Sequence, residues 1–364
     1  MQLAIVNEWM NVYGGAERKL AEILDLYPQA HLYALIHNRQ PFIGTPLEQQ
    51  NFGTSFMQKI PRVEQFYRGL LPLMPFAIEC MDVRGYDVVL SISHAVAHGV
   101  KTTKDQIHIS YVCSPMRYAW HQQDAYLRLH RLDRPIIGNI ARLILGLLRR
   151  WDKGSASRAN HLLANSDWTA QRIKQAWGRD SRVIYPPVDV KRFDPAPQRD
   201  DFYLYVSRLV PYKMTAEIIS AFNQLEFPLV VVGDGPEMPR LQRLAKDNIK
   251  LMGHQPDSVV TDLMNRARAF VYMAVEDFGI AMAEAQAAGC PVIAYEMGGA
   301  AEIVRDGETG MLFQEQIARS LVEAVLKSKN RKFNSKAAQE NAARFSSERF
   351  RNEFPAYMDR VTNR

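Results

Sequence analysis

Residues 269–299, AFVYMAVEDFGIAMAEAQAAGCPVIAYEMGG, contain the pattern that decides the fold class. Ala269–Met273 and Pro291–Tyr295 are short, continuous apolar runs, which is typical of parallel strands buried on both faces. Between them, Ile280–Ala288 is a run of small residues that favour a helix. The order strand, helix, strand predicts a crossover unit of a parallel sheet with helices packed against it.

The same alternation extends in both directions from this unit. In the second half, three more strands are predicted at Phe202–Ser207, Pro228–Gly233 and Ile249–Met252, with helices at Pro236–Lys246 and Ser258–Ala267. In the first half, strands are predicted near 2–7, 86–92, 107–112 and 160–165, with helices near 16–27, 137–150 and 167–176. The fold class is therefore α/β, with two Rossmann-like, doubly wound domains.

The chain length also favours two domains, because 364 residues exceed the size at which one hydrophobic core usually stops growing. Prolines at 186, 187, 195 and 197 mark the linker. We expect an N-terminal domain at 1–187, a C-terminal domain at 188–345 and a C-terminal helix at 346–364 that returns to the first domain. Pro355 is expected to kink or split this helix.

The composition limits the classes of function. The three cysteines show no ligand spacing, so neither a disulfide scaffold nor a structural zinc site is expected, and a reducing cytosol is the expected location. No signal peptide is predicted at the start, and no apolar run is long enough to span a membrane. The protein is expected to be cytoplasmic, with peripheral attachment to the inner face of the cell membrane as a further possibility.

The positive charge is concentrated in the first half. Residues 1–190 hold 22 Lys and Arg against 16 Asp and Glu, whereas residues 191–364 hold 23 of each. A basic half favours an anionic partner, and lipid head groups, nucleic acid and phosphorylated substrates each fit that charge.

Candidate binding residues follow the predicted strands, where ligands of open parallel sheets bind. Arg208 and Lys213 come after the strand 202–207 and are suited to holding a diphosphate, although two solvated cations are the alternative. Two glycine turns are candidate phosphate cradles, with an ordinary turn as the alternative for each, and they contain Gly14 with Gly15 and Gly298 with Gly299. A third turn, at Gly233, is predicted to shape a wall of the cleft, with a purely structural role as the alternative to ligand contact.

Two carboxylates belong to the segment quoted above. Glu276 is predicted in the loop after a strand, and Glu284 in a helix of small apolar residues, where a carboxylate is costly without a partner. Both are suited to accepting hydrogen bonds from sugar and ribose hydroxyls. Phe278-Gly279-Ile280 lies between them and makes the pattern far more specific than two acids alone.

These motifs, in this order, resemble retaining glycosyltransferases of the GT-B fold, and specifically glycosyltransferase family 4. The resemblance covers essentially the whole chain and implies a nucleotide sugar in the C-terminal domain, an acceptor in the N-terminal domain and a reaction in the cleft between them. It implies that Arg208 and Lys213 hold the donor diphosphate, that Glu276 contacts the transferred sugar and that Glu284 contacts the ribose. Neither a metal nor a cofactor is implied. Further donor-binding positions implied by the resemblance are Gly14, Gly15, Phe278, Gly279, Ile280, Gly233 and Gly299.

A narrower likeness lies at Tyr111–Trp120, YVCSPMRYAW, and again at Arg150-Trp151-Asp152. These segments resemble bacterial mannosyltransferases that use GDP-mannose to build O-antigen or exopolysaccharide. In many relatives a histidine stands where this chain has Cys113. A thiol is a poorer hydrogen-bond donor, so His94, after another predicted strand, is a second candidate for the catalytic role, with a structural histidine as the alternative. Arg117 and Tyr118, with Cys113, are candidate acceptor-binding residues.

The resulting prediction is a retaining transferase that moves mannose from GDP-mannose to a polyprenyl-diphosphate-linked glycan in bacterial surface polysaccharide synthesis. A UDP-sugar donor and a nucleotide-sugar epimerase of similar fold are the alternatives. Nucleic-acid binding is not expected, because the sequence contains no corresponding motif. Apolar stretches at 136–148 and 59–76 are candidate membrane contacts, with burial in the core as the alternative.

Overall fold

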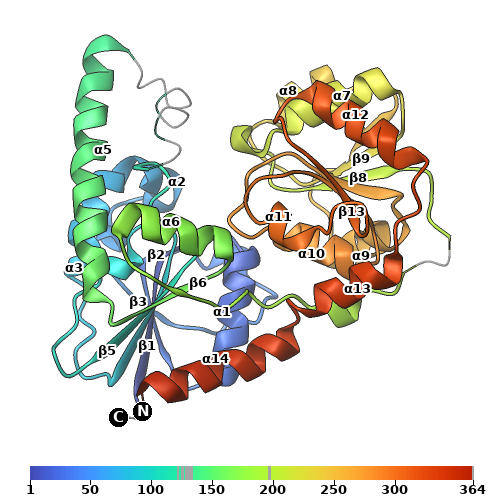
Figure 1. The fold of residues 1–364 in the computed structure, drawn as a ribbon. Coiled ribbons are helices and arrows are strands. Elements are labelled where there is room, and N and C mark those ends of the chain that lie inside the picture. The colour runs from blue at the N-terminus through green and yellow to red at the C-terminus, as the bar shows by residue number, and fades with distance from the viewer. Residues whose placement is uncertain (121–122, 124–126, 128–133, 196–197, 363–364) are drawn as a thin grey trace. The chain divides into compact units, whose positions relative to one another are not determined.

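The computed structural model describes residues 1–120, 123, 127, 134–195 and 198–362. The chain divides into unit 1, which is Met1–Tyr185 with Arg351–Arg364, and unit 2, which is Pro186–Phe350. Figure 1 shows a sheet with surrounding helices in each unit. The α/β fold class with two parallel sheets is thereby confirmed.

Unit 1 is built on a seven-stranded sheet in the order β3-β2-β1-β4-β5-β6-β7. All of its strand pairs are parallel. The strands are β1 (Leu3–Met10), β2 (His31–His37), β3 (Phe52–Thr54), β4 (Val88–Ser93), β5 (Ile107–Val112), β6 (His161–Ala164) and β7 (Arg182–Val183). Every residue of β4 and β5 is buried, as expected for central parallel strands covered on both faces.

Helix α6 of unit 1 begins and ends with recognisable signals. In α6, the Ser166 side chain accepts a hydrogen bond from the Thr169 amide at the start, and Gly178 adopts a left-handed conformation at the end. The other α-helices are α1 (Gly15–Leu26), α2 (Val63–Phe66), α3 (Met74–Glu79) and α5 (Pro135–Ser155), and α6 itself is Asp167–Trp177. Short 3-10 helices are η1 (Gln40–Phe42), η2 (Phe56–Lys59), η3 (Tyr67–Leu73), η4 (Ala97–Gly99) and η5 (Ala156–Arg158).

Unit 2 contains a six-stranded parallel sheet in the order β10-β9-β8-β11-β12-β13. The strands are β8 (Tyr203–Val206), β9 (Leu229–Val232), β10 (Ile249–Leu251), β11 (Ala269–Tyr272), β12 (Val292–Tyr295) and β13 (Gly310–Phe313). The helices are α7 (Thr215–Leu225), α8 (Met238–Leu244), α9 (Asp257–Arg266), α10 (Ile280–Ala287), α11 (Ala300–Ile303), α12 (Ala318–Lys329) and α13 (Ser335–Ala343), with η6 (Val190–Arg192) and η7 (Pro211–Lys213).

Helix α14 (Ser347–Thr362) starts in unit 2 and continues into unit 1, where Arg351 binds Glu22 and Asp25 of α1. The predicted split at Pro355 is wrong, because α14 runs through this residue, whereas a kink there stays a prediction. An interior proline costs about 3 kcal/mol. The side chains of α14 that are fully buried contribute about 1.5–3 kcal/mol each, which offsets that cost. They are Phe350, Phe354 and Met358.

Candidate functional site

The order of strands reverses once in each sheet. In unit 2 the chain runs from β8 outward to β9 and β10 and returns to β11 on the other side of β8. In unit 1 it runs from β1 to β2 and β3 and returns to β4 on the other side of β1. Ligands of open parallel sheets bind beyond the carboxyl ends of the strands at such a reversal. The loops after β8 and β11, and after β1 and β4, are therefore the candidate sites.

In unit 2 the reversal brings a buried ion pair together. Lys213, at the end of η7, binds the carboxylate of Glu276 from the loop after β11, and the Tyr272 hydroxyl donates to the same carboxylate oxygen. The Lys213 ammonium also lies 3.1 Å from the Tyr272 hydroxyl. Only 14% of the Lys213 side chain and 12% of the Glu276 side chain are exposed. Two predicted residues thus meet, and Tyr272 was not predicted from the sequence.

Electrostatics keep this cluster in defined protonation states. Burial lowers the pKa of Lys213, but the charge and hydrogen bond of Glu276 together with the neighbouring Tyr212 and Tyr205 raise it overall, so the ammonium stays charged. Burial and then the Glu276 charge raise the pKa of Tyr272 well above its ordinary value, so its hydroxyl remains a donor. The backbone of Lys213 is fixed as well, because the Tyr205 hydroxyl donates to its carbonyl over 2.9 Å.

Arg208 lies two residues after the end of β8 and is exposed. Its backbone is tied into the sheet edge, because its neighbour Leu209 donates to the Asp234 carbonyl in the loop after β9. An exposed guanidinium and a mostly buried ammonium on the same loop are suited to binding an anion with two phosphate groups.

Two of the candidate glycines are required by close backbone packing. A Cβ at Gly233, whose φ is +133°, would lie 1.8 Å from the Ser207 carbonyl oxygen. A Cβ at Gly299 would lie 1.7 Å from the Phe278 carbonyl oxygen. The Gly299 amide donates to the Glu276 carbonyl over 2.9 Å, so this turn holds the loop that carries Glu276. The structural reading of both glycines is therefore supported, and a role in binding stays a prediction.

Glu284 lies in α10 and has a cationic partner that the sequence did not indicate. The Arg192 guanidinium, from η6, lies 2.6 Å from its carboxylate. A carboxylate in a close-packed helix requires such a partner. Contact with a ribose stays a prediction.

The residues between the two acids differ in exposure. The Phe278 side chain is buried, with its ring 5.1 Å from that of Phe345, so mainly its backbone remains for a ligand. Gly279 adopts a φ of +100° at the start of α10. Ile280 is half-buried.

In unit 1 the loop after β1 leads into α1. Gly14 precedes the helix and Gly15 is its first residue, as predicted for a strand-to-helix turn. The Gly14 amide donates to the Glu17 carboxylate over 2.9 Å, so this amide is already occupied by the protein. Burial raises the pKa of Glu17 despite that hydrogen bond.

The loop after β5 carries the candidate acceptor residues. Cys113 is half-buried, and the Lys19 ammonium lies 2.9 Å from its sulfur and 3.9 Å from the centre of the Tyr111 ring. Lys19 is buried and was not predicted from the sequence. Arg117 and Tyr118 lie half-buried in the turn that follows Cys113.

His94 comes directly after β4, beside the buried Glu8 of β1. Its Nδ1 lies 2.8 Å from the Glu8 carboxylate, and its ring meets that of Trp9 edge to face at 4.6 Å. Burial lowers the pKa of His94, but the Glu8 carboxylate outweighs burial and raises it. Burial raises the pKa of Glu8, but the charge of His94 and several hydrogen bonds lower it to about 2. Glu8 was missed because a single acid inside an apolar strand has no recognisable spacing.

Helix α5 buries one side in the core of unit 1 and exposes apolar side chains on the other, so both alternatives for its apolar sequence, burial and a membrane contact, remain open. Leu145 and Leu148 are buried in the core of unit 1. The opposite side carries large apolar side chains that are 46–65% exposed, namely Ile137, Ile140, Leu143 and Leu147. In the other candidate stretch, Tyr67, Leu71 and Met74 are buried, whereas Phe66 and Phe76 are exposed.

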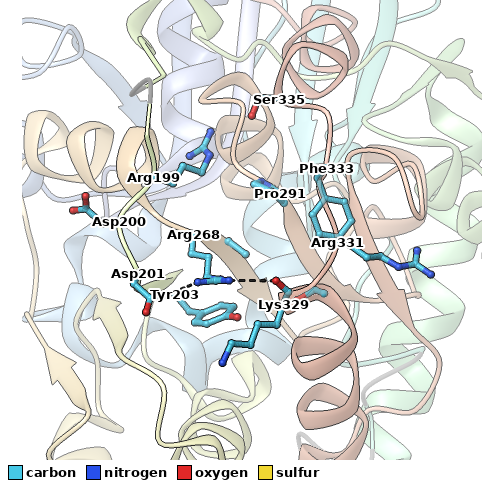
Figure 2. Close-up of a pocket in the computed structure, with 12 residues that line it drawn as sticks. Arg199, Asp200, Asp201, Tyr203, Arg268, Pro291, Lys329, Arg331, Phe333 and Ser335 are labelled. Atoms are coloured by element: carbon cyan, nitrogen blue, oxygen red, sulfur yellow. Dashed lines mark hydrogen bonds and ion pairs between the residues drawn. The ribbon is translucent and has the colours of Figure 1, made fainter.

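A cavity of about 280 Å³ lies elsewhere in unit 2 (Figure 2). Its lining includes Tyr203, Ala269 and Pro291, which stand at the amino ends of β8, β11 and β12, away from the candidate loops. Arg199 there binds backbone carbonyls, and Arg268 binds Asp201. This cavity is therefore not at the end of the sheet where a substrate is expected.

Within the described ranges, no three His, Cys, Asp or Glu residues are grouped so that they would hold a metal ion. None of the helices in those ranges meets the length and hydropathy required to cross a bilayer.

Comparisons with known proteins agree with this geometry. Residues 189–345 match the family described as Glycosyl transferases group 1. A GDP-mannose-dependent monoacylated alpha-(1-6)-phosphatidylinositol monomannoside mannosyltransferase of Corynebacterium glutamicum is 32% identical in an alignment that covers 44% of this chain and 50% of that protein. The chain spans about half the length of the curated relatives it matches.

Two solved structures share the fold over nearly the whole chain. Sucrose-phosphate synthase from Thermosynechococcus elongatus has a TM-score of 0.75 at 17% identity, with 99% of each chain covered. Anabaena Alr3699/HepE, solved with UDP-glucose, has a TM-score of 0.72 at 19% identity, with 99% of this chain and 100% of that chain covered. Residues 189–345 therefore form a domain of the group 1 glycosyltransferase family, and the two units have the GT-B fold of these structures.

Proposed function

We propose that this protein is a retaining glycosyltransferase that transfers mannose from GDP-mannose to a polyprenyl-diphosphate-linked glycan during bacterial surface polysaccharide synthesis. The observation that carries the proposal is the cluster at the strand reversal of unit 2. There, Lys213 and Glu276 are in contact, and Arg208 is exposed in the loop that leads to Lys213. Family membership of residues 189–345 supports a nucleotide-sugar donor in this unit.

The proposed chemistry requires no enzymatic nucleophile. Donor and acceptor meet on one face of the sugar, the bond from the sugar to the diphosphate breaks, and the departing phosphate oxygen takes the acceptor proton. Arg208 and Lys213 stabilise the negative charge on that oxygen, an effect worth several kcal/mol in other enzymes. Glu276, oriented by Tyr272 and Lys213, accepts hydrogen bonds from the sugar hydroxyls. These groups replace the charge that a metal ion would supply.

Two nucleotide-sugar donors are candidates, and they differ in the base. GDP-mannose is favoured by the motif at Tyr111–Trp120 and by the name of the corynebacterial relative. A UDP-sugar is the second candidate, because Anabaena Alr3699/HepE was solved with UDP-glucose.

Isothermal titration with GDP, UDP and their sugars, followed by turnover with a synthetic polyprenyl-diphosphate-linked glycan, tests the proposal. We expect tighter binding of GDP than of UDP and consumption of GDP-mannose only when the acceptor is present. Release of a new sugar or nucleotide sugar without an acceptor would instead indicate an epimerase. Failure to bind any nucleoside diphosphate would refute the proposal.

The exposed face of α5 supports an acceptor at a membrane surface. Beside its four exposed apolar side chains, α5 carries the exposed cations Arg142, Arg150 and Lys153, and its single acid, Asp152, is buried. Apolar side chains flanked by cations fit a bilayer that contains anionic lipid. We propose that this face lies on the cytoplasmic membrane.

Binding to vesicles of phosphatidylglycerol and phosphatidylcholine tests this contact. Leu143→Glu should weaken binding roughly tenfold or more, because it removes one buried leucine and adds repulsion. Leu326→Glu on α12, where Leu326 is 49% exposed, is the matched control and should leave binding unchanged. Equal binding of the wild type to purely neutral vesicles, or self-association through α5, would contradict the proposed contact.

A further inference from the structure

The backbone of the loop between β4 and η4 donates hydrogen bonds to one buried carboxylate, that of Glu8. Glu8 is 1% exposed, and one oxygen of its carboxylate, Oε1, accepts hydrogen bonds from the Ser93 hydroxyl and from four successive backbone amides. The donors are the Ser93 hydroxyl at 3.1 Å and the backbone amides of His94 at 2.9 Å, Ala95 at 2.9 Å, Val96 at 3.0 Å and Ala97 at 3.0 Å. This concentration of donors on one oxygen stabilises the charged form of Glu8.

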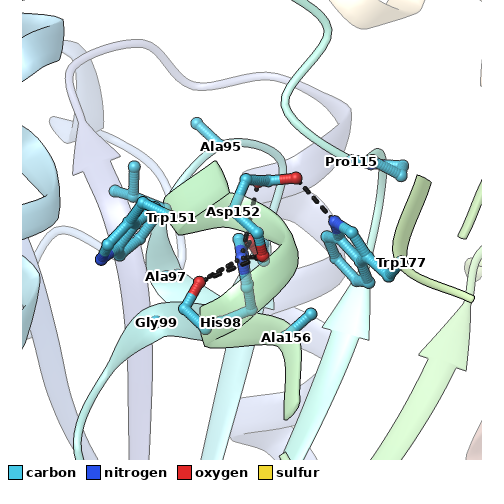
Figure 3. Close-up of polar contacts among 12 residues, drawn as sticks. Ala95, Ala97, His98, Gly99, Pro115, Trp151, Asp152, Ala156 and Trp177 are labelled. Atoms are coloured by element: carbon cyan, nitrogen blue, oxygen red, sulfur yellow. Dashed lines mark hydrogen bonds and ion pairs between the residues drawn. The ribbon is translucent and has the colours of Figure 1, made fainter. Parts of the chain in front are cut away.

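A second buried carboxylate, that of Asp152 in α5, contacts η4, the 3-10 helix that follows the same loop (Figure 3). His98 of η4 lies with Nε2 3.5 Å from Asp152, which also accepts from the indole nitrogen of Trp177 at 2.6 Å. The Ser93 hydroxyl connects the two carboxylates, because it lies 3.0 Å from Nδ1 of His98. The loop is therefore anchored at both ends, and His94 has little freedom to move.

The remaining oxygen of Glu8 binds His94 itself, at 2.8 Å from Nδ1. The side chain of His94 is still 34% exposed, and in the described ranges no hydrogen bond is formed by its Nε2. The charged groups that act on this ring are Glu8, Glu17 at the start of α1 and Arg117 in the loop after β5. Two carboxylates thus oppose one guanidinium, which favours the protonated ring.

We propose that Glu8 is a positioning residue that fixes His94 as an imidazolium, and that the exposed Nε2–H of His94 donates to a phosphate oxygen of the substrate bound in unit 1. This inference rests on the proposed function for the identity of the substrate. A histidine held in this state cannot accept a proton from an acceptor hydroxyl, so it does not act as a general base. The diphosphate of a prenyl-linked acceptor has the required chemistry, and the diphosphate of the nucleotide sugar, which the proposed function assigns to unit 2, is the second source to be distinguished by experiment.

NMR of protein labelled at the histidine ring nitrogens tests the protonation state without any assay of transfer. In the wild type, His94 should titrate above its ordinary pKa of 6.5. Glu8→Gln should lower the pKa of His94 relative to the wild type. Burial and the Arg117 charge lower this pKa, and the variant lacks the Glu8 charge that raises it. Glu79→Gln is the matched control, since Glu79 is another carboxylate of unit 1 in an ion pair, with Arg158, and it should leave His94 unchanged.

The phosphate contact is tested with GDP and with farnesyl diphosphate as separate probes. The probe that occupies the site should shift the Nε2 signal of His94, and His94→Gln should weaken its binding about tenfold. Glu8→Gln should lower kcat/KM about a hundredfold, mainly through kcat, with a greater loss at pH 8 than at pH 6.

Different results would overturn the role of His94 and the proposed glycosyl transfer. A His94 ring that is neutral at pH 7 in the wild type, or one whose titration ignores Glu8→Gln, overturns the inference while leaving glycosyl transfer untouched. Absence of transfer with a high titration of His94 and a response to a diphosphate overturns the proposed function instead. If Glu8→Gln does not fold, the titration of wild-type His94 still tests its protonation state. The His94→Gln variant still tests the phosphate contact, because it retains the hydrogen bonds between Glu8 and the loop backbone.

Discussion

Removal of the Lys213 charge should lower the free energy of unfolding of unit 2. The size of the loss follows from how little of the Lys213–Glu276 ion pair is exposed to solvent. Both side chains are less than 15% exposed, and Lys213→Met leaves the Glu276 carboxylate without its cation. Breaking a fully buried pair in this way costs about 3–5 kcal/mol. Because a small part of each side chain is exposed, we take the lower limit, about 3 kcal/mol. With a denaturant slope of about 2 kcal/mol per molar urea, the midpoint should fall by about 1.5 M.

Removal of both charges should cost much less than removal of one. The double variant Lys213→Met/Glu276→Gln leaves no unpaired ion, and replacement of a buried pair by neutral groups is often close to neutral. We expect the double variant to recover at least half of the lost stability. As a control in the same unit, Arg319→Met breaks an exposed pair with Glu323 and should shift the midpoint by only about 0.2 M.

Urea unfolding followed by two probes separates the units. All five tryptophans lie in unit 1, so their fluorescence reports on unit 1, whereas far-UV circular dichroism reports on both units. The dichroism transition should shift in Lys213→Met. A shift no larger than that of Arg319→Met, or an equal loss in the single and double variants, would refute the assignment of Lys213 and Glu276 as a buried, interdependent pair.

Three further outcomes are expected. Arg208→Ala should weaken nucleoside diphosphate binding ten- to a hundredfold in calorimetry without changing the unfolding midpoint, since Arg208 is exposed; unchanged affinity would remove it from the site. Gly299→Ala should destabilise unit 2 and lower turnover, because its Cβ would meet the Phe278 carbonyl, and a fully active, equally stable variant would contradict this packing. The stability that Glu8 contributes is present above pH 4.5 and lost as the pH falls towards 2, and that of His94 is present below pH 6.5 and lost as the pH rises through its raised pKa. The difference in tryptophan-monitored stability between wild type and Glu8→Gln should therefore be greatest between pH 4.5 and 6.5, and a difference independent of pH would show that the pair is not the cause.

The sequence was sufficient for local features. Continuous apolar runs such as Ala269–Met273 predicted buried parallel strands, because a strand covered on both faces has no polar side. The positions of Arg208, Lys213 and Glu276 just after strands predicted that they would lie at one edge of a sheet, since all carboxyl ends of a parallel sheet share that edge. The contact between Lys213 and Glu276 agrees with this reasoning.

Only the tertiary structure decided which partner each charge has. Glu8, Lys19, Tyr272 and Arg192 lie within ordinary strand and helix sequences, and nothing in their spacing indicates that they contact His94, Cys113, Glu276 and Glu284. The contact of Glu8 with His94 depends on strand order, which brings β1 beside β4 although many residues separate them in the chain. Lys19 and Arg192 lie 94 and 92 positions from their partners, and Tyr272, although close to Glu276 in the chain, also contacts Lys213 from 59 positions away. The continuation of α14 through Pro355 also depends on tertiary structure, because Phe354 and Met358 are fully buried and the Phe354 ring contacts Tyr27 and Tyr111 of unit 1. Their burial outweighs the local preference of proline against a helix interior. Local propensity and periodicity act over a few residues, whereas the burial and pairing of a charge depend on segments that meet only in the folded chain.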